Sequence, residues 1–131
     1  MRIDDVLRVV AVRRGKPRTA EFTLRPGERG LSLFALVDLP TVESIIAAVQ
    51  VAGKRGELAA AVFGADDLRK LGLRLIPTLG GTPDETVNAV HLEARFPRWR
   101  EWLLRLRGRP IHQEFNERLS ARLAEIASIL E

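Results

Sequence analysis

The sequence predicts an α+β fold, with a mainly antiparallel or mixed sheet of about six strands and helices packed on one face. Three observations lead to this class. The first third of the chain is rich in β-branched and alternating segments, short apolar segments follow in the middle, and the last third has helical periodicity that predicts two C-terminal helices. At 131 residues the chain has the length of one domain, so we expect a single α+β domain over residues 1–131.

The first third of the chain predicts three strands. Residues 6–13 are rich in β-branched side chains and residues 19–24 alternate between polar and apolar types. A turn-forming segment at 14–18 separates them, which is typical of a hairpin. A second turn-forming segment, 26–30, precedes an apolar strand at 31–36.

The first helix is expected after Asp38 or Thr41, because either side chain can cap a helix. Gly53 supplies its C-terminal stop. The apolar stripe that recurs with the period of a helix consists of Val42, Ile45, Ile46 and Val49.

The middle of the chain predicts a strand, a short helix and a strand at residues 58–63, 65–71 and 73–76. Such a unit is typical of a small parallel crossover. After a glycine-rich loop, residues 87–95 alternate and predict a half-buried strand.

Two helices are expected at the C-terminal end, one starting at Pro97 and one at Pro110, with a break at Gly108. The second helix has a seam of apolar residues that either packs on the chain's own sheet or faces a protein partner, including a second copy of the chain. The two apolar stripes consist of Trp99, Trp102, Leu103 and Leu106, and of Ile111, Phe115, Leu119, Leu123, Ile126 and Leu130.

The composition of the chain excludes several kinds of functional site. The chain has no cysteine, which excludes disulfides, thiolate zinc sites and cysteine nucleophiles and agrees with a cytoplasmic location. No run of about 18 apolar residues occurs, so we expect no membrane span and no membrane partner. His91 and His112 lack the spacing of a metal site relative to the acidic residues, and we expect neither a metal nor a cofactor.

His91, Glu93 and Arg95 form a candidate catalytic cluster. Alternate side chains of a strand project from the same face, so these three are expected together. A neutral histidine beside a carboxylate and a guanidinium supports acid–base chemistry or anion binding. The alternative is an exposed sheet face with a Glu93–Arg95 ion pair, which would contribute little to stability.

The glycine-rich loop before this strand is a candidate anion site, because glycines let backbone amides approach a phosphate. Plain turn formation explains the same residues. The loop leads directly into the His91 strand, so its polar side chains are expected at the same sheet edge. The candidate ligand-binding residues are Gly80, Gly81, Thr82, Asp84 and Asn88.

Basic residues outnumber acidic ones by 21 to 17, and most of them are arginines. Arginines interleaved with Trp99 and Trp102 are typical of single-stranded nucleic-acid binding, whereas a GC-rich genome also enriches arginine and the tryptophans fall at core spacing. The first hairpin either extends this basic surface or protects a sheet edge. The candidate surface for nucleic acid or a protein partner consists of Arg13, Arg14, Arg18, Arg98, Arg100, Arg105, Arg107 and Arg109.

An arginine, a serine and a glutamate occur in this order along the chain, each in a different expected strand. Arg8 lies in the first expected strand, Ser32 in the segment GLSLF, and Glu93 in a later strand. In this Arg–Ser–Glu order the chain resembles ADP-ribosyltransferase-type toxins. The resemblance implies an enzyme that acts on a nucleotide.

Two functions therefore follow from the sequence. The first is a small, bacterial-type regulatory module without enzymatic activity, which binds a protein partner, or nucleic acid through its arginine-rich helix. The second is a small enzyme acting on a nucleotide or other phosphate-bearing substrate, with His91 or Glu93 as acid or base and Arg95 with the Gly80 loop holding the anion.

Overall fold

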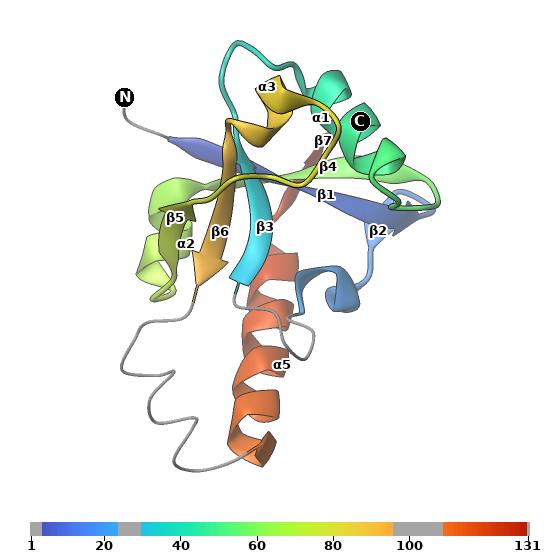
Figure 1. Cartoon of the computed structure of the whole chain (residues 1–131). Helices are drawn as coiled ribbons and strands as arrows, with labels where there is room; N and C mark the ends of the chain where they lie inside the picture. The colour runs from blue at the N-terminus through green and yellow to red at the C-terminus, as the bar shows by residue number, and fades with distance from the viewer. Residues whose placement is uncertain (1–3, 24–29, 96–108, 131) are drawn as a thin grey trace.

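A computed structural model describes residues 4–23, 30–95 and 109–130, with side chains described from Glu117 onward in the last range. These residues form a seven-stranded antiparallel sheet whose main path runs β5-β6-β3-β1-β4-β7, while β2 pairs with β1 outside that path (Figure 1). The strands are β1 (Asp5–Arg13), β2 (Lys16–Pro17), β3 (Gly30–Ala35), β4 (Leu58–Gly64), β5 (Arg74–Pro77), β6 (His91–Arg95) and β7 (Ser128–Leu130).

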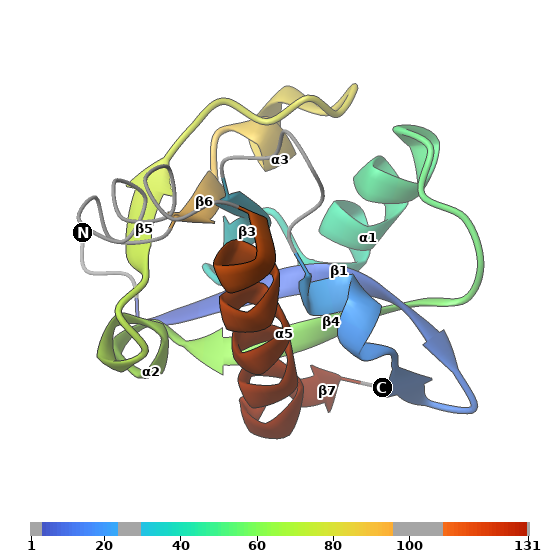
Figure 2. The same cartoon turned by 90° about the horizontal axis from the view of Figure 1, so that it is seen from below.

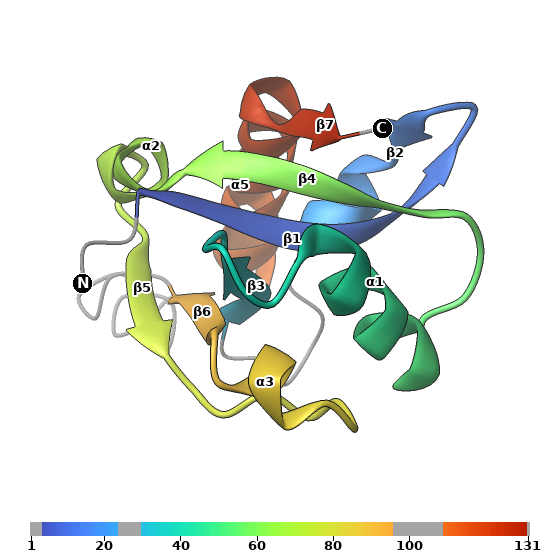
Figure 3. The ribbon, with the colours of Figure 1, turned by 90° about the horizontal axis from the view of Figure 1, so that it is seen from above.

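Helices cover both faces of the sheet. The α5 helix (Arg109–Ile126), α2 (Ala65–Lys70) and a 3-10 helix, η1 (Thr19–Phe22), lie on one face, and α1 (Val42–Val51) and α3 (Glu85–Asn88) lie on the other (Figures 2 and 3). The α+β class is confirmed, but helices cover both faces of the sheet and not the single face that we expected. The reason is visible in β1, where Val6 and Leu7 point to opposite faces and are both fully buried.

The first helix follows its sequence signals. Thr41 is the N-cap of α1, and its side chain accepts a hydrogen bond from the Ser44 backbone amide at 3.2 Å. Ile45 is fully buried against the sheet. The amphipathic period and the capping residue therefore predicted this helix correctly.

The first hairpin is shorter than expected. Only Lys16 and Pro17 pair with β1, and residues 19–22 form η1 instead of a strand. Proline has no amide hydrogen to donate to a ladder, so Pro17 is a natural place for the pairing to end. Phe22 is then buried in the core, where its ring meets Phe63 edge-on with centroids 5.8 Å apart.

The middle of the chain also differs from expectation. β4 and β5 are connected through α2, but β4 pairs with β1 and β7 whereas β5 pairs with β6, always antiparallel. No parallel pair forms among the described strands, so the expected parallel crossover is wrong. Three strands separate β4 from β5 in the sheet.

The later elements begin and end at other residues than expected. Residues 85–88 form α3, whose N-cap is Asp84, and the strand starts only at His91. The terminal helix ends at Ile126, and Leu130 lies in β7, which pairs with β4. The helix predicted from Pro97 falls outside the described residues. None of the described helices has the length and apolar character that a membrane span requires.

Candidate functional site

The site begins where β1 and β3 separate. These strands pair only at Val6–Ala35 and Leu7–Phe34, whereas β3 stays paired with β6 down to Gly30. The next residue of β1 is Arg8, which lies at the split. Its Nη1 donates to the Ser32 carbonyl at 2.9 Å and its Nε donates to the Glu21 carbonyl at 2.6 Å. Arg8 thus joins β3 to η1 across the gap between the strands.

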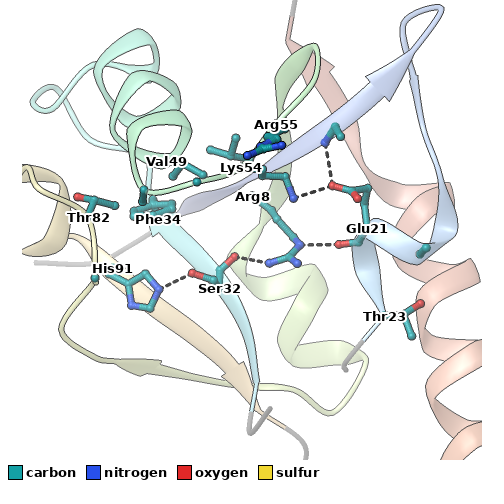
Figure 4. A pocket seen from close by; sticks show the side chains of 16 residues that line it. Arg8, Glu21, Thr23, Ser32, Phe34, Val49, Lys54, Arg55, Thr82 and His91 are labelled. Carbon is teal, nitrogen blue, oxygen red and sulfur yellow. Dashed lines mark hydrogen bonds and ion pairs between the residues drawn. The ribbon is translucent and has the colours of Figure 1, made fainter. Parts of the chain in front are cut away.

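A pocket of about 660 Å³ opens over this split (Figure 4). Its volume falls within the usual range for small-molecule sites. Residues of β1, β3, η1, β6, the end of α1 and the segment after it, and the glycine-rich loop contribute to its walls. Polar side chains that line it include those of Arg8, Glu21, Ser32, Lys54, Thr82 and His91.

His91 is held on both sides of its ring. Nδ1 is hydrogen-bonded to the Thr78 hydroxyl at 2.8 Å, and Nε2 is hydrogen-bonded to the Ser32 hydroxyl. The Phe34 ring packs edge-on against the imidazole, with centroids 5.2 Å apart. These contacts fix the orientation of the imidazole at the pocket wall.

The charge state of His91 follows from its surroundings. Burial lowers its pKa below the ordinary value of 6.5, and this effect outweighs a hydrogen bond to the Thr78 backbone and the negative charge of Glu93, which both act in the opposite direction. His91 is therefore mostly neutral at pH 7. A neutral imidazole keeps one nitrogen lone pair with which to accept a proton.

Glu93 and Arg95 share the face of β6 with His91, as the alternation predicted, but they interact with each other. Arg95 Nε donates to Glu93 Oε2 at 2.9 Å, and both side chains are about one-quarter exposed. Neither is among the described residues that line the pocket. Of the three residues, His91 alone contributes to the pocket wall, and the catalytic assignment of the cluster stays a prediction.

The glycine-rich loop is held together by Asn88. Its side-chain oxygen accepts from the Thr82 amide at 2.9 Å and from the Thr82 hydroxyl at 2.7 Å, and its side-chain nitrogen donates to the Thr82 carbonyl at 2.8 Å. The Gly80 amide donates to the Asn88 carbonyl. The Asp84 amide also donates to the Thr82 hydroxyl, so three amides of this loop are already used within the chain, which leaves less backbone for an anion than we expected.

The loop residues divide between two surfaces. Gly81 and Thr82 line the pocket beside His91. A Cβ on Gly80 would lie 3.2 Å from the His91 Cβ, so this glycine allows the loop to approach the histidine closely. Asp84 caps α3 and faces a separate open groove beside α1.

Three charged residues of the pocket, Glu21, Lys54 and Arg55, had no signal in the sequence. Glu21 accepts a hydrogen bond from the Ala11 amide at 2.7 Å, and Lys54 forms an ion pair with the same carboxylate oxygen at 2.8 Å. Glu21 lies in a segment that resembled a strand, and Lys54 lies in the turn after α1. Only the fold brings them together.

The arginine surface is described in part. Arg13, Arg14 and Arg18 are exposed at the β1–β2 hairpin. Arg98, Arg100, Arg105 and Arg107 lie outside the described residues, as does the side chain of Arg109, the first residue of α5. Binding of nucleic acid or of a protein partner by this surface stays a prediction.

The described residues of the α5 apolar seam pack on the chain's own sheet. Leu119 and Leu123 are buried in the same core as Phe22 and Phe63. For these two residues, the seam packs on the chain's own sheet, which was one of the two alternatives that the sequence left open. Because Leu119 and Leu123 are buried in this core, a partner or a second copy of the chain would have to contact other residues of α5. Such an interaction stays a prediction.

Comparison of the chain with models of protein families, with curated proteins and with solved structures found no match in any of the three. Within the described residues, no group of three or more histidine, aspartate or glutamate side chains is placed to hold a metal ion.

Proposed function

We propose that the chain is a small enzyme that acts on a nucleotide or other phosphate-bearing substrate bound over the split between β1 and β3. The observation that carries the proposal is the Ser32–His91 hydrogen bond at the wall of a 660 Å³ pocket that also contains cationic side chains. A proton acceptor and an anion-binding wall in one cavity are the elements that such chemistry requires.

The acid–base element is the pair of Ser32 and His91. In the tautomer with its proton on Nδ1, which faces Thr78, His91 accepts a proton at Nε2. A substrate hydroxyl or water that takes the place of Ser32 as the hydrogen-bond partner would then lose its proton to His91. This is general-base catalysis by a neutral histidine.

The anion-binding element is the turn after α1. Lys54 and Arg55 both line the pocket, and Arg55 is exposed. A guanidinium matches two phosphate oxygens with parallel hydrogen bonds. Lys54 is already paired with Glu21, so Arg55 is the residue that we assign to the phosphate.

The resemblance to ADP-ribosyltransferase-type toxins suggests which reaction to test first. Its three residues come from β1, β3 and β6, where β3 lies between the other two. Arg8 bonds to the Ser32 backbone, and Ser32 is opposite Glu93 in the β3–β6 register. In that reaction the bond from the nicotinamide nitrogen to the ribose C1′ of NAD⁺ breaks. C1′ then bonds to the oxygen of water or of an acceptor, whose proton His91 would take.

The experiment incubates the chain with NAD⁺ and measures nicotinamide release by chromatography, with binding of NAD⁺ and ADP-ribose followed by calorimetry. His91→Gln should reduce turnover by about 10² or more, as expected for loss of a general base, while Glu57→Gln, an exposed control, should not. Turnover that is equal in both variants would remove His91 from the mechanism. No binding of NAD⁺, ADP-ribose or ATP by the unchanged chain would refute the proposed function.

A second candidate is binding of another macromolecule, and the exposed apolar side chains support it. Leu39, Val51 and Leu79 are 74%, 72% and 86% exposed. Contiguous exposed apolar surface is typical of interaction sites, so this candidate requires that these side chains form one surface. Light scattering over a concentration series tests for a dimer, and a monomer that also fails to bind oligonucleotides at low salt would count against this candidate.

A further inference from the structure

Glu21 is an acidic side chain in a pocket whose other charged groups are positive. The η1 segment that carries it is fixed by the buried Phe22 and by a hydrogen bond of 2.7 Å between the hydroxyls of Thr23 and Ser120. The carboxylate lines the pocket, with only 18% of its side chain exposed (Figure 4). Its position is therefore set by the core and by α5.

The carboxylate uses one oxygen within the chain. The Ala11 amide and the Lys54 ammonium both contact Oε1, at 2.7 and 2.8 Å. Among the described residues, no hydrogen bond or ion pair reaches Oε2. Oε2 is thus available to accept a hydrogen bond from a ligand.

The carboxylate is ionised at neutral pH. Burial raises its pKa, but the hydrogen bonds from Lys54 and the Ala11 amide, with the positive charges of Lys54 and Arg8, outweigh burial and leave the pKa below 4.5. An ionised carboxylate only accepts hydrogen bonds, so it favours a neutral or cationic donor and disfavours a phosphate beside it.

We infer that Glu21 determines specificity by accepting a hydrogen bond from a sugar hydroxyl of the ligand, while Arg55 receives the phosphate. The inference rests on the proposed function and names the substrate class more closely: a sugar-bearing phosphate such as a nucleotide, in preference to a bare phosphate. A ligand with only phosphate oxygens would meet the negative charge of Glu21 and leave Oε2 without a donor.

The test compares ADP-ribose with inorganic pyrophosphate, which has phosphates but no ribose, by calorimetry on the unchanged chain and on Glu21→Gln. The variant keeps the side-chain length and loses the charge. We expect it to bind ADP-ribose about ten-fold more weakly, the effect of losing one charge-assisted hydrogen bond. It should bind pyrophosphate equally well or better. Glu57→Gln, which removes an exposed carboxylate that does not line the pocket, should change neither dissociation constant.

Three outcomes overturn the inference. In the first, Glu21→Gln changes the dissociation constant for ADP-ribose by less than two-fold. In the second, the variant loses the same affinity for ADP-ribose as for pyrophosphate. Either result shows that Glu21 does not recognise the sugar. Absence of binding of NAD⁺, ADP-ribose and ATP by the unchanged chain refutes the proposed function and this inference together, whereas the first two outcomes leave the proposed function standing.

If Glu21→Gln fails to fold, the inference is tested by comparing the affinities of two ligands for the unchanged chain. Ribose 5-phosphate should then bind at least about ten-fold more tightly than inorganic phosphate. Equal affinity for the two would overturn the inference without any variant.

Discussion

Ser120 and Thr23 lie 97 positions apart in the chain, yet their hydroxyls are hydrogen-bonded at 2.7 Å. Ser120 also donates to the Phe22 carbonyl at 3.3 Å, and its side chain is almost completely buried. Through these bonds α5 holds the η1 segment, which carries Glu21 into the pocket. The terminal helix is therefore connected to the candidate site, although none of its described side chains lines the pocket.

Replacement of Ser120 by alanine should destabilise the fold by about 1 kcal/mol, because a buried hydrogen bond is lost. The measurement is chemical denaturation followed by circular dichroism. Ser128→Ala removes a hydroxyl from an exposed position of β7 and serves as the control. An equal, small effect of both changes would show that the Ser120–Thr23 bond contributes nothing to stability.

Leu123→Ala should be more severe, at about 2–5 kcal/mol, because it leaves a cavity in the core shared with Phe22 and Phe63. Leu39→Ala, at a 74% exposed position, is the matched control for stability and should leave the midpoint of denaturation unchanged. If the α5 seam served a partner and not the core, Leu123→Ala would leave the midpoint of denaturation unchanged and alter the oligomeric state instead.

Periodicity predicted the elements that depend on local sequence. The stripe of α1 and its Thr41 cap were predicted, as was the common face of His91, Glu93 and Arg95, because helix and strand periods are properties of neighbouring residues. The α+β class followed from the succession of such elements.

The pocket depends instead on contacts between distant residues. Ser32 and His91 are 59 positions apart, and the β3–β6 register brings them together. Alternation allowed for the Glu93–Arg95 ion pair, which was the alternative for this cluster, but it gave no sign that His91 reaches the pocket.

Glu21 was missed for a related reason. The segment TAEFTL alternates as a strand would, but pairing with β1 ends at Pro17 and the chain turns into η1. Its partners, Ala11 and Lys54, belong to β1 and to the turn after α1, and no local pattern links them to position 21.

The ionised state of Glu21 predicts how stability depends on pH. A carboxyl whose pKa is lower in the folded than in the unfolded chain contributes stability above its unfolded pKa, near 4.5. That contribution is lost as pH falls through the folded pKa. The difference in the free energy of unfolding between the unchanged chain and Glu21→Gln should therefore be largest near pH 7. The two denaturation curves should converge in acid. A constant difference down to pH 3 would contradict the assignment of the lowered pKa.

The neutral state of His91 predicts the pH dependence of the proposed reaction. Because burial lowers the His91 pKa below 6.5, the base form should predominate over a wider range than for an exposed histidine. The turnover of NAD⁺ should rise with pH up to a plateau, with an apparent pKa below 6.5. Thr78→Val removes the hydroxyl that contacts Nδ1, so it should lower turnover and shift this profile, whereas a change in fold stability alone would lower turnover at every pH equally. Thr86→Val, at an exposed position in α3, is the matched control and should leave the profile unchanged. An acidic limb centred above 6.5 would indicate that a group other than His91 accepts the proton.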